Sequence, residues 1–203
     1  MQEKIAKTVS YLFHPLLFPF FTLITLIIQK PYLYFDVPLY YTLLLLGIVL
    51  LTTVLFPILI IYFLLRKQVI SSFFLRTKEE RIYPILCVAV FYYLTYYLLK
   101  GVLISGFFSY YLLGATLLAI FALLTNFYYK ISLHLISIGS FTGFYIGIAI
   151  SSGNYFFPYI FLGILFSGLL GFARLKSQSH TPNEIYFGFL MGLFTMLFLI
   201  FLF

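Results

Sequence analysis

The chain has 203 residues, of which 64% are hydrophobic and 8% are charged, and its mean hydropathy is +1.11. A soluble domain carries about 25% charged residues, so this composition excludes a water-soluble globular protein. The net charge of +7 does not indicate nucleic-acid binding, because the charges lie in short segments between apolar runs, as in membrane topology.

Apolar runs recur along the whole chain, and each is long enough to cross a bilayer as a helix of roughly 20 residues. In chain order the predicted spans are Tyr11–Gln29, Pro38–Leu65, Ile82–Leu99, Val102–Phe127, Ile131–Ile150, Tyr155–Ala173 and Ile185–Phe203. The third span is the shortest. We therefore predict an all-α, polytopic transmembrane helical bundle with six to seven helices, forming one integral membrane domain over residues 1–203.

Positive charge is distributed unevenly between the two sides of the predicted bundle. If the spans alternate in direction, Lys30 and Lys100 are the only two of the 12 Lys and Arg residues that lie opposite the N-terminus. The positive-inside rule then places the N-terminus in the cytoplasm. The N-terminal side still carries more Lys and Arg residues than the opposite side when Lys78, Arg81 and Arg174 are left out of the count as candidate site residues.

Two predicted spans carry glycines at intervals of four residues. Gly139, Gly143 and Gly147 share one face of the fifth span, and Gly188 and Gly192 repeat the spacing in the seventh. Such faces let helices approach closely in a membrane. They predict tight packing inside one bundle, with a homodimer interface as the alternative.

Three polar clusters lie at residues 76–81, 132–134 and 174–184. The first and last directly precede the third and seventh spans, and the second opens the fifth span, so all three lie on the same predicted side of the membrane. Helix N-termini offer unpaired N–H groups and partial positive charge, which favour an anion. We predict that the clusters meet at one phosphate-binding pocket.

Each cluster also has a structural interpretation. Residues 66–81 form a basic loop of the kind that sets topology, and His134 fits a buried histidine that bridges two helices. Thr181 and Glu184 fit a capping box. His14 has no evident partner and is interpreted as structural.

Residues 173–184 resemble the third signature of the type 2 phosphatidic acid phosphatase superfamily, S-R-x5-H-x3-D. The spacings from Arg174 to His180 and from His180 to Glu184 are kept, while Ala173 replaces the serine and Glu184 replaces the aspartate. The second signature, P-S-G-H, looks like residues 131–134, where Ser132 and His134 are kept.

The first signature of that superfamily, K-x6-R-P, is similar only in part to residues 74–84. Arg81 matches its arginine, Phe74 stands at its lysine, and Pro84 comes two positions late. Lys78 or Arg76 is the candidate replacement for the lysine. The His14-Pro15 pair in the first span also looks like that of small, divergent bacterial members.

This resemblance implies a phosphatase without metal or cofactor, with its core at about residues 76–203 and N-terminal spans at about 11–65. His180 would attack phosphorus to form a phosphohistidine, and Glu184 would orient it. His134 would protonate the leaving alcohol. The capping box competes for Glu184, so we expect one of its two roles to dominate.

The residues implied to bind the phosphoryl oxygens are Arg174, Arg81, Lys78 and Ser132. The implied partners are a phosphorylated phospholipid or polyprenyl lipid and the surrounding membrane lipids, without nucleic acid. The implied location is the inner membrane of a bacterium. Two alternatives remain: a catalytically degenerate member that binds or transports such a lipid, and a structural membrane subunit whose charges only set topology.

The orientation generates the first testable prediction. In cells producing Ser71→Cys or Ser152→Cys protein, an impermeant thiol reagent added outside should modify the variant at position 152 and spare the one at position 71, because the basic loop faces the cytoplasm. Wild-type protein gives the baseline for Cys87. Modification at position 71 alone would reverse the predicted orientation.

Overall fold

The computed structural model describes residues 2–29, 38–72, 77–100, 106–153 and 156–202. The chain is 86% helical, and the described residues contain no strand. Within these ranges, seven helical segments are long and apolar enough to cross a membrane. The predicted all-α transmembrane bundle is therefore confirmed, and the chain is an integral membrane protein.

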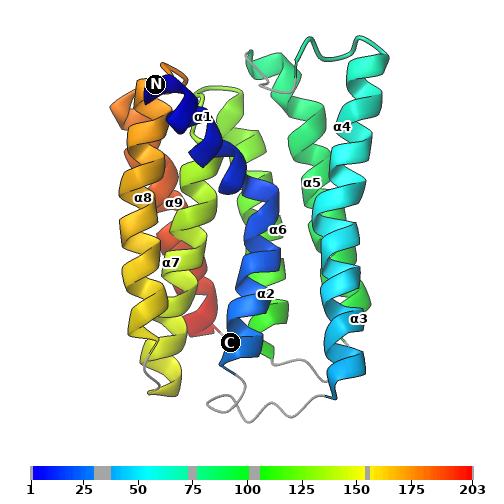
Figure 1. Ribbon diagram of the computed structural model, residues 1–203, viewed down its shortest axis with the longest axis vertical. Helices are drawn as coiled ribbons and strands as arrows, with labels where there is room; N and C mark the ends of the chain where they lie inside the picture. Colours follow the sequence, from blue (N-terminus) through cyan, green and yellow to red (C-terminus); the bar gives the residue numbers. More distant parts are fainter. Residues whose placement is uncertain (1, 30–37, 73–76, 101–105, 154–155, 203) are drawn as a thin grey trace. The chain divides into compact units, whose positions relative to one another are not determined.

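The helices follow one another along the chain as labelled in Figure 1. Their bounds are α1 Gln2–Leu12, η1 Pro15–Leu17, α2 Phe18–Ile28, α3 Leu39–Leu50, η3 Leu51–Leu55, α4 Phe56–Arg66, α5 Lys78–Leu99, α6 Gly106–Asn126, α7 Leu133–Ser152, α8 Phe157–Lys176 and α9 Pro182–Leu202. They form two compact units, residues 1–18 with 129–203 (unit 1) and residues 19–128 (unit 2). The predicted single domain stays a prediction.

Large apolar side chains are exposed along the helices of unit 1. Phe161 and Phe172 on α8 are 66% and 57% exposed, and Phe187 and Phe198 on α9 are 60% and 65% exposed. Such patches would promote aggregation in water. In a bilayer these side chains face lipid at no cost.

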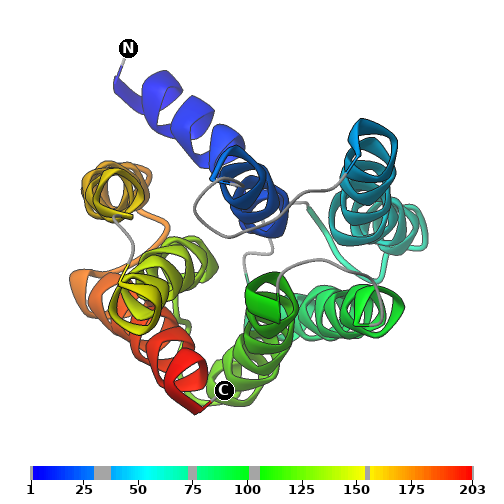
Figure 2. The same cartoon turned by 90° about the horizontal axis from the view of Figure 1, so that it is seen from below.

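Helix α7 packs against α9 with almost no space between the two backbones (Figure 2). A Cβ atom built on Gly139 would overlap the Phe189 carbonyl, and one on Gly143 would overlap the Leu193 carbonyl. The contact advances by four residues along both helices, so α7 and α9 are parallel. The glycine faces thus pack inside the chain, as the favoured interpretation predicted.

The parallel packing brings the N-termini of α7 and α9 to the same place. The backbone N–H of Ser132, directly before α7, donates a hydrogen bond to the Glu184 carbonyl in the first turn of α9 (3.2 Å). Two of the three polar clusters that we predicted to meet, residues 132–134 and 174–184, are therefore adjacent.

The first predicted span is broken in its N-terminal half. Helix α1 ends at Leu12, the short 3-10 helix η1 begins at Pro15, and α2 starts at Phe18. Proline removes a backbone donor and clashes with the preceding turn, which ends a helix. The Phe13 ring packs on Phe166 of α8 with ring centroids 4.5 Å apart, so the break lies against α8.

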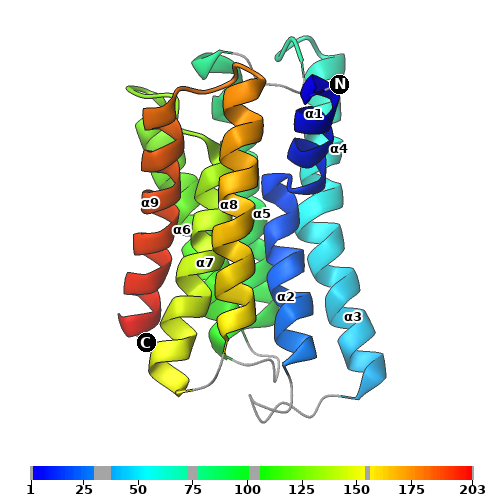
Figure 3. The ribbon, with the colours of Figure 1, turned by 60° about the vertical axis from the view of Figure 1, so that its left-hand side comes forward.

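In unit 2, α3, η3 and α4 form one continuous column with a π-helical turn at its centre (Figure 3). The Thr95 hydroxyl of α5 donates to the buried Thr52 hydroxyl in that turn (2.8 Å). Helix α5 is longer than the predicted third span, because Thr77 caps it by accepting a hydrogen bond from Glu80 N–H (3.4 Å). The predicted start of the fourth span at Val102 lies outside the described residues.

The glycine contact generates a prediction about stability. Gly192→Ala should lower the free energy of unfolding by about 1–3 kcal/mol, because the added Cβ would overlap the Ile136 carbonyl and backbone cannot move aside cheaply. Gly168→Ala in α8 is the control, since nothing lies within 4 Å of its Cβ position. The measurement is the thermal unfolding midpoint in detergent, and equal midpoints for the two variants would contradict the packing.

Candidate functional site

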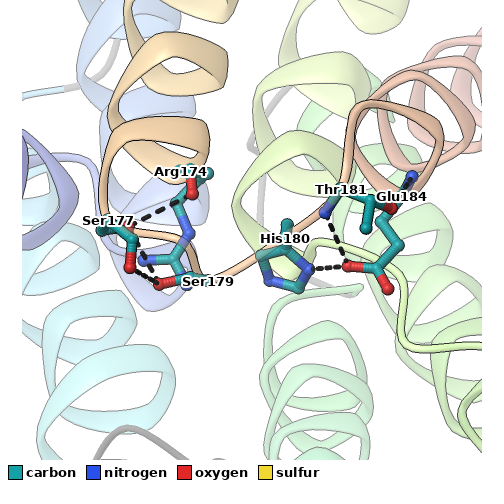
Figure 4. Close-up of polar contacts among 6 residues, drawn as sticks. All are labelled: Arg174, Ser177, Ser179, His180, Thr181 and Glu184. Atoms are coloured by element: carbon teal, nitrogen blue, oxygen red, sulfur yellow. Dashed lines mark hydrogen bonds and ion pairs between the residues drawn. The ribbon is translucent and has the colours of Figure 1, made fainter.

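Buried His180 and half-buried Glu184 form a pair at the start of α9. The His180 Nδ1 atom lies 2.7 Å from Glu184 Oε2, and the side chains are 1% and 15% exposed. An ionised carboxylate only accepts hydrogen bonds, so Nδ1 donates and Nε2 carries the lone pair of the neutral ring. Figure 4 shows Nε2 on the ring edge that faces away from Glu184, toward Arg174.

A tight turn at the end of α8 delivers His180 to this position. Gln178 N–H donates to the Leu175 carbonyl (2.9 Å) and Ser179 N–H to the Arg174 carbonyl (3.1 Å). With Gln178 in the left-handed region at φ 52°, these two bonds make a Schellman motif. Only His180 and Thr181 then separate the turn from α9, so the position of His180 follows from the two helix ends.

Glu184 makes both of its predicted contacts at once. Its Oε2 accepts from Thr181 N–H (3.2 Å) while Glu184 N–H donates to Thr181 Oγ1 (3.5 Å), which completes the capping box. The same Oε2 accepts the bond from His180. A carboxylate oxygen has two lone pairs, so the cap and the histidine do not compete, contrary to our expectation.

His134 lies in the first turn of α7 and bonds to the N-terminal segment. Its Nε2 is 3.1 Å from the Ser10 carbonyl oxygen. A carbonyl only accepts, so Nε2 carries the proton and Nδ1 has the lone pair when the ring is neutral. His134 thus bridges α7 and α1, as the structural interpretation predicted, without excluding a chemical role.

The His14 and His134 rings meet in a T-shaped arrangement, with centroids 5.7 Å apart and planes at 77°. Arg174 bonds to Ser10, the residue whose carbonyl is bonded by His134, and Glu184, which bonds to His180, also accepts from Ser132 N–H two residues before His134. The three histidines of the chain and Arg174 therefore gather in one region of unit 1. Sequence alone did not place His14 there.

Arg174 lies in the last turn of α8 rather than at a helix N-terminus. Its Nη1 donates a long hydrogen bond to Ser10 Oγ (3.5 Å), and its buried Nε has no hydrogen-bond partner. Within the described residues, no carboxylate lies at ion-pair distance from it. The guanidinium can therefore bind an anion without losing an internal ion pair.

The Ser132 hydroxyl is a second buried polar group without a partner. Ser132 is the N-cap residue of α7 and is 0% exposed, yet its side chain makes no capping bond. An unsatisfied buried donor costs about 1–3 kcal/mol. Ser132 Oγ, Arg174 Nε and two adjacent helix N-termini thus offer hydrogen-bonding capacity and positive potential, which suit a phosphate group.

Arg81 and Lys78, the other predicted phosphate ligands, lie in the first turn of α5 in unit 2. Arg81 is 5% exposed. Lys78 Nζ donates to the Tyr128 carbonyl (2.7 Å), and the Lys78 carbonyl accepts from Asn126 Nδ2 (2.7 Å). Their role at the phosphate stays a prediction, and Arg76 lies outside the described residues.

No group of three or more His, Cys, Asp or Glu side chains in the described part of the chain is placed to hold a metal ion. Compared with known protein families, curated proteins and solved structures, the chain has no match. The superfamily resemblance thus depends on the motif residues alone.

The shared carboxylate oxygen generates a prediction. Glu184→Ala should lower the free energy of unfolding by more than Thr181→Ala, since it removes the cap bond and also leaves the buried His180 Nδ1 without its acceptor. Losing a helix cap costs about 1 kcal/mol, and the stranded ring donor adds about 1–3 kcal/mol. Chemical denaturation in detergent measures both, and equal losses would contradict the shared role.

Proposed function

We propose that the chain is a membrane-embedded lipid phosphate phosphatase related to the type 2 phosphatidic acid phosphatases. The observation that supports this most is the His180–Glu184 pair at 2.7 Å, with Nε2 directed toward Arg174. A carboxylate on Nδ1 holds the tautomer in which Nε2 is nucleophilic, the arrangement that covalent catalysis by histidine requires.

In the proposed first step, His180 Nε2 attacks phosphorus of a phosphate monoester or diphosphate. A P–N bond forms and the bond from phosphorus to the leaving oxygen breaks. The Nδ1–H of His180 keeps its hydrogen bond to the Glu184 carboxylate, which stabilises the positive charge that develops on the ring. A protonated His134 supplies the proton that the leaving oxygen takes up.

In the proposed second step, water attacks the phosphohistidine. His134, now neutral, accepts a proton from this water through Nδ1, since its Nε2–H is bonded to the Ser10 carbonyl. The P–N bond breaks, inorganic phosphate leaves, and both histidines return to their starting states. No oxidant, metal or cofactor enters this balance.

Arg174 and Ser132 are the proposed phosphate ligands in unit 1. Fixed donors directed at developing charge contribute about 10²–10³-fold each in enzymes. The Arg174 guanidinium and the Ser132 hydroxyl have unused hydrogen-bonding capacity, and the N-termini of α7 and α9 add positive potential. Arg81 and Lys78 remain proposed additional ligands.

The proposed substrate is a phospholipid or polyprenyl phosphate. The proposed site residues lie at the ends of α7, α8 and α9, and in a membrane the headgroup of a lipid lies at the ends of the spanning helices when its tail is in the bilayer core. The exposed apolar faces of α8 and α9 suit contact with lipid tails. We place the protein in the inner membrane of a bacterium, as the superfamily resemblance implies.

One observation favours the second candidate, a degenerate member that binds or transports a phosphorylated lipid. Phe74 stands at the lysine of the first signature, and Ala173 replaces the serine of the third. A site that lacks one of its phosphate-binding cations binds phosphate but stabilises its transfer less well.

The phosphatase proposal predicts that purified protein in detergent releases phosphate from a short-chain phosphatidic acid or a polyprenyl diphosphate with EDTA present. His180→Ala should lower kcat by several orders of magnitude, as nucleophile removal does in a serine protease (about 10⁶-fold). Colorimetric phosphate release measures both.

Gly168→Ala serves as the control, because its Cβ position is open and lies outside the site. Activity that persists in the His180 variant removes the nucleophile assignment. Absence of release from wild type and variant alike, together with saturable binding of the lipid by wild type, favours the binding protein instead.

A further inference from the structure

The break in the first span leaves the Ser10 backbone carbonyl outside the helical ladder. Phe13 N–H donates to the Val9 carbonyl (3.0 Å), but His14 N–H donates to the Tyr11 carbonyl (3.3 Å) instead of continuing to Ser10. Pro15 has no N–H, so it does not occupy the Tyr11 carbonyl as a regular helix residue would. The ladder therefore passes over the Ser10 carbonyl.

The His134 ring takes the place of the missing backbone donor. Its Nε2 lies 3.1 Å from the Ser10 carbonyl oxygen. In a membrane, a carbonyl freed by proline has to be satisfied by a neighbouring group. Here that group is the residue proposed as the general acid.

The Ser10 hydroxyl links the same turn to Arg174. Ser10 Oγ donates to the Ala6 carbonyl (2.9 Å) and accepts from Arg174 Nη1 (3.5 Å). One residue thus touches His134 with its carbonyl and Arg174 with its hydroxyl. A displacement of this turn would move both.

His14 stabilises the break itself. Its Nδ1 accepts a hydrogen bond from Leu16 N–H (3.4 Å) and so caps η1. Its ring also packs on the His134 ring. The same side chain therefore holds the turn and limits rotation of His134.

We infer that Pro15, by breaking the first span, makes the Ser10 carbonyl the group that sets the tautomer of His134. Ser10 and His14 are positioning residues of the site. With the proton held on Nε2, Nδ1 is the atom that exchanges protons with substrate and water. The kinetic part of this inference rests on the proposed phosphatase function, and the tautomer itself does not.

The tautomer can be measured in the wild-type protein. Three histidines give three imidazole signal sets when the detergent-solubilised protein carries isotope-labelled histidine, and His134→Gln assigns the relevant one. At about pH 8, where an ordinary histidine is neutral, NMR should find the His134 proton on Nε2 in slow exchange with water. A proton on Nδ1 would overturn the inference.

Pro15→Ala tests the cause. The backbone N–H that this substitution introduces can bond to the Tyr11 carbonyl and release His14 N–H to the Ser10 carbonyl, which displaces His134. We expect mixed His134 tautomers and a kcat about 10- to 100-fold lower, the range for loss of a residue that orients a ligand, with KM nearly unchanged. Pro158→Ala is the matched control, because Pro158 lies in the first turn of α8, where no N–H is needed.

The outcomes separate the two proposals. Altered tautomers with unchanged kcat would overturn the positioning role while the phosphatase proposal stands. A wild-type protein that keeps the proton on Nε2 but releases no phosphate supports the positioning and contradicts only the phosphatase. If Pro15→Ala does not fold, the wild-type spectrum still decides the tautomer.

Discussion

The backbone contact between α7 and α9 is the constraint on which the candidate site depends. Glycines at matching heights let the parallel helices lie with their main chains in contact, and the Ser132–Glu184 bond joins their first turns. Any side chain larger than hydrogen at Gly139, Gly143 or Gly192 would push the N-termini of α7 and α9 apart. The glycine spacing therefore determines the geometry of the candidate site as well as the stability of the helix pair.

A membrane interior contains no water that could bond to an unpaired backbone group. In unit 1, side chains of the candidate site supply the missing hydrogen-bond partners. The carbonyl freed at Ser10 is bonded by His134, and the cap of α9 shares its carboxylate with His180. Both histidines are thus oriented by groups that the helices have to satisfy in any case. Local folding and orientation of the site are consequences of the same hydrogen bonds.

The sequence predicted the number and order of the spans well, because apolar length alone decides whether a helix crosses a membrane. It also predicted the capping box, which depends on a spacing of three residues within one turn. The superfamily resemblance implied the pairing of Glu184 with His180, but we expected only one of the two contacts to dominate. The sequence missed Ser10 and His14, since their contacts connect opposite ends of the chain. The proline after His14 was the available signal, but a proline marks a freed carbonyl without showing which side chain reaches it.

The connection between α8 and α9 is short, and most of its residues take part in the motifs that end α8 and begin α9. In the Schellman motif, Gln178 and Ser179 form hydrogen bonds to the last turn of α8, and in the capping box Thr181 forms one to Glu184 in the first turn of α9. One residue inserted between Arg174 and Ser179 would break the Schellman motif, and one inserted between His180 and Glu184 would change the spacing that brings these two side chains together. Homologous chains that share this site should therefore tolerate substitutions in residues 177–179 while keeping the number of residues between the arginine and the histidine constant.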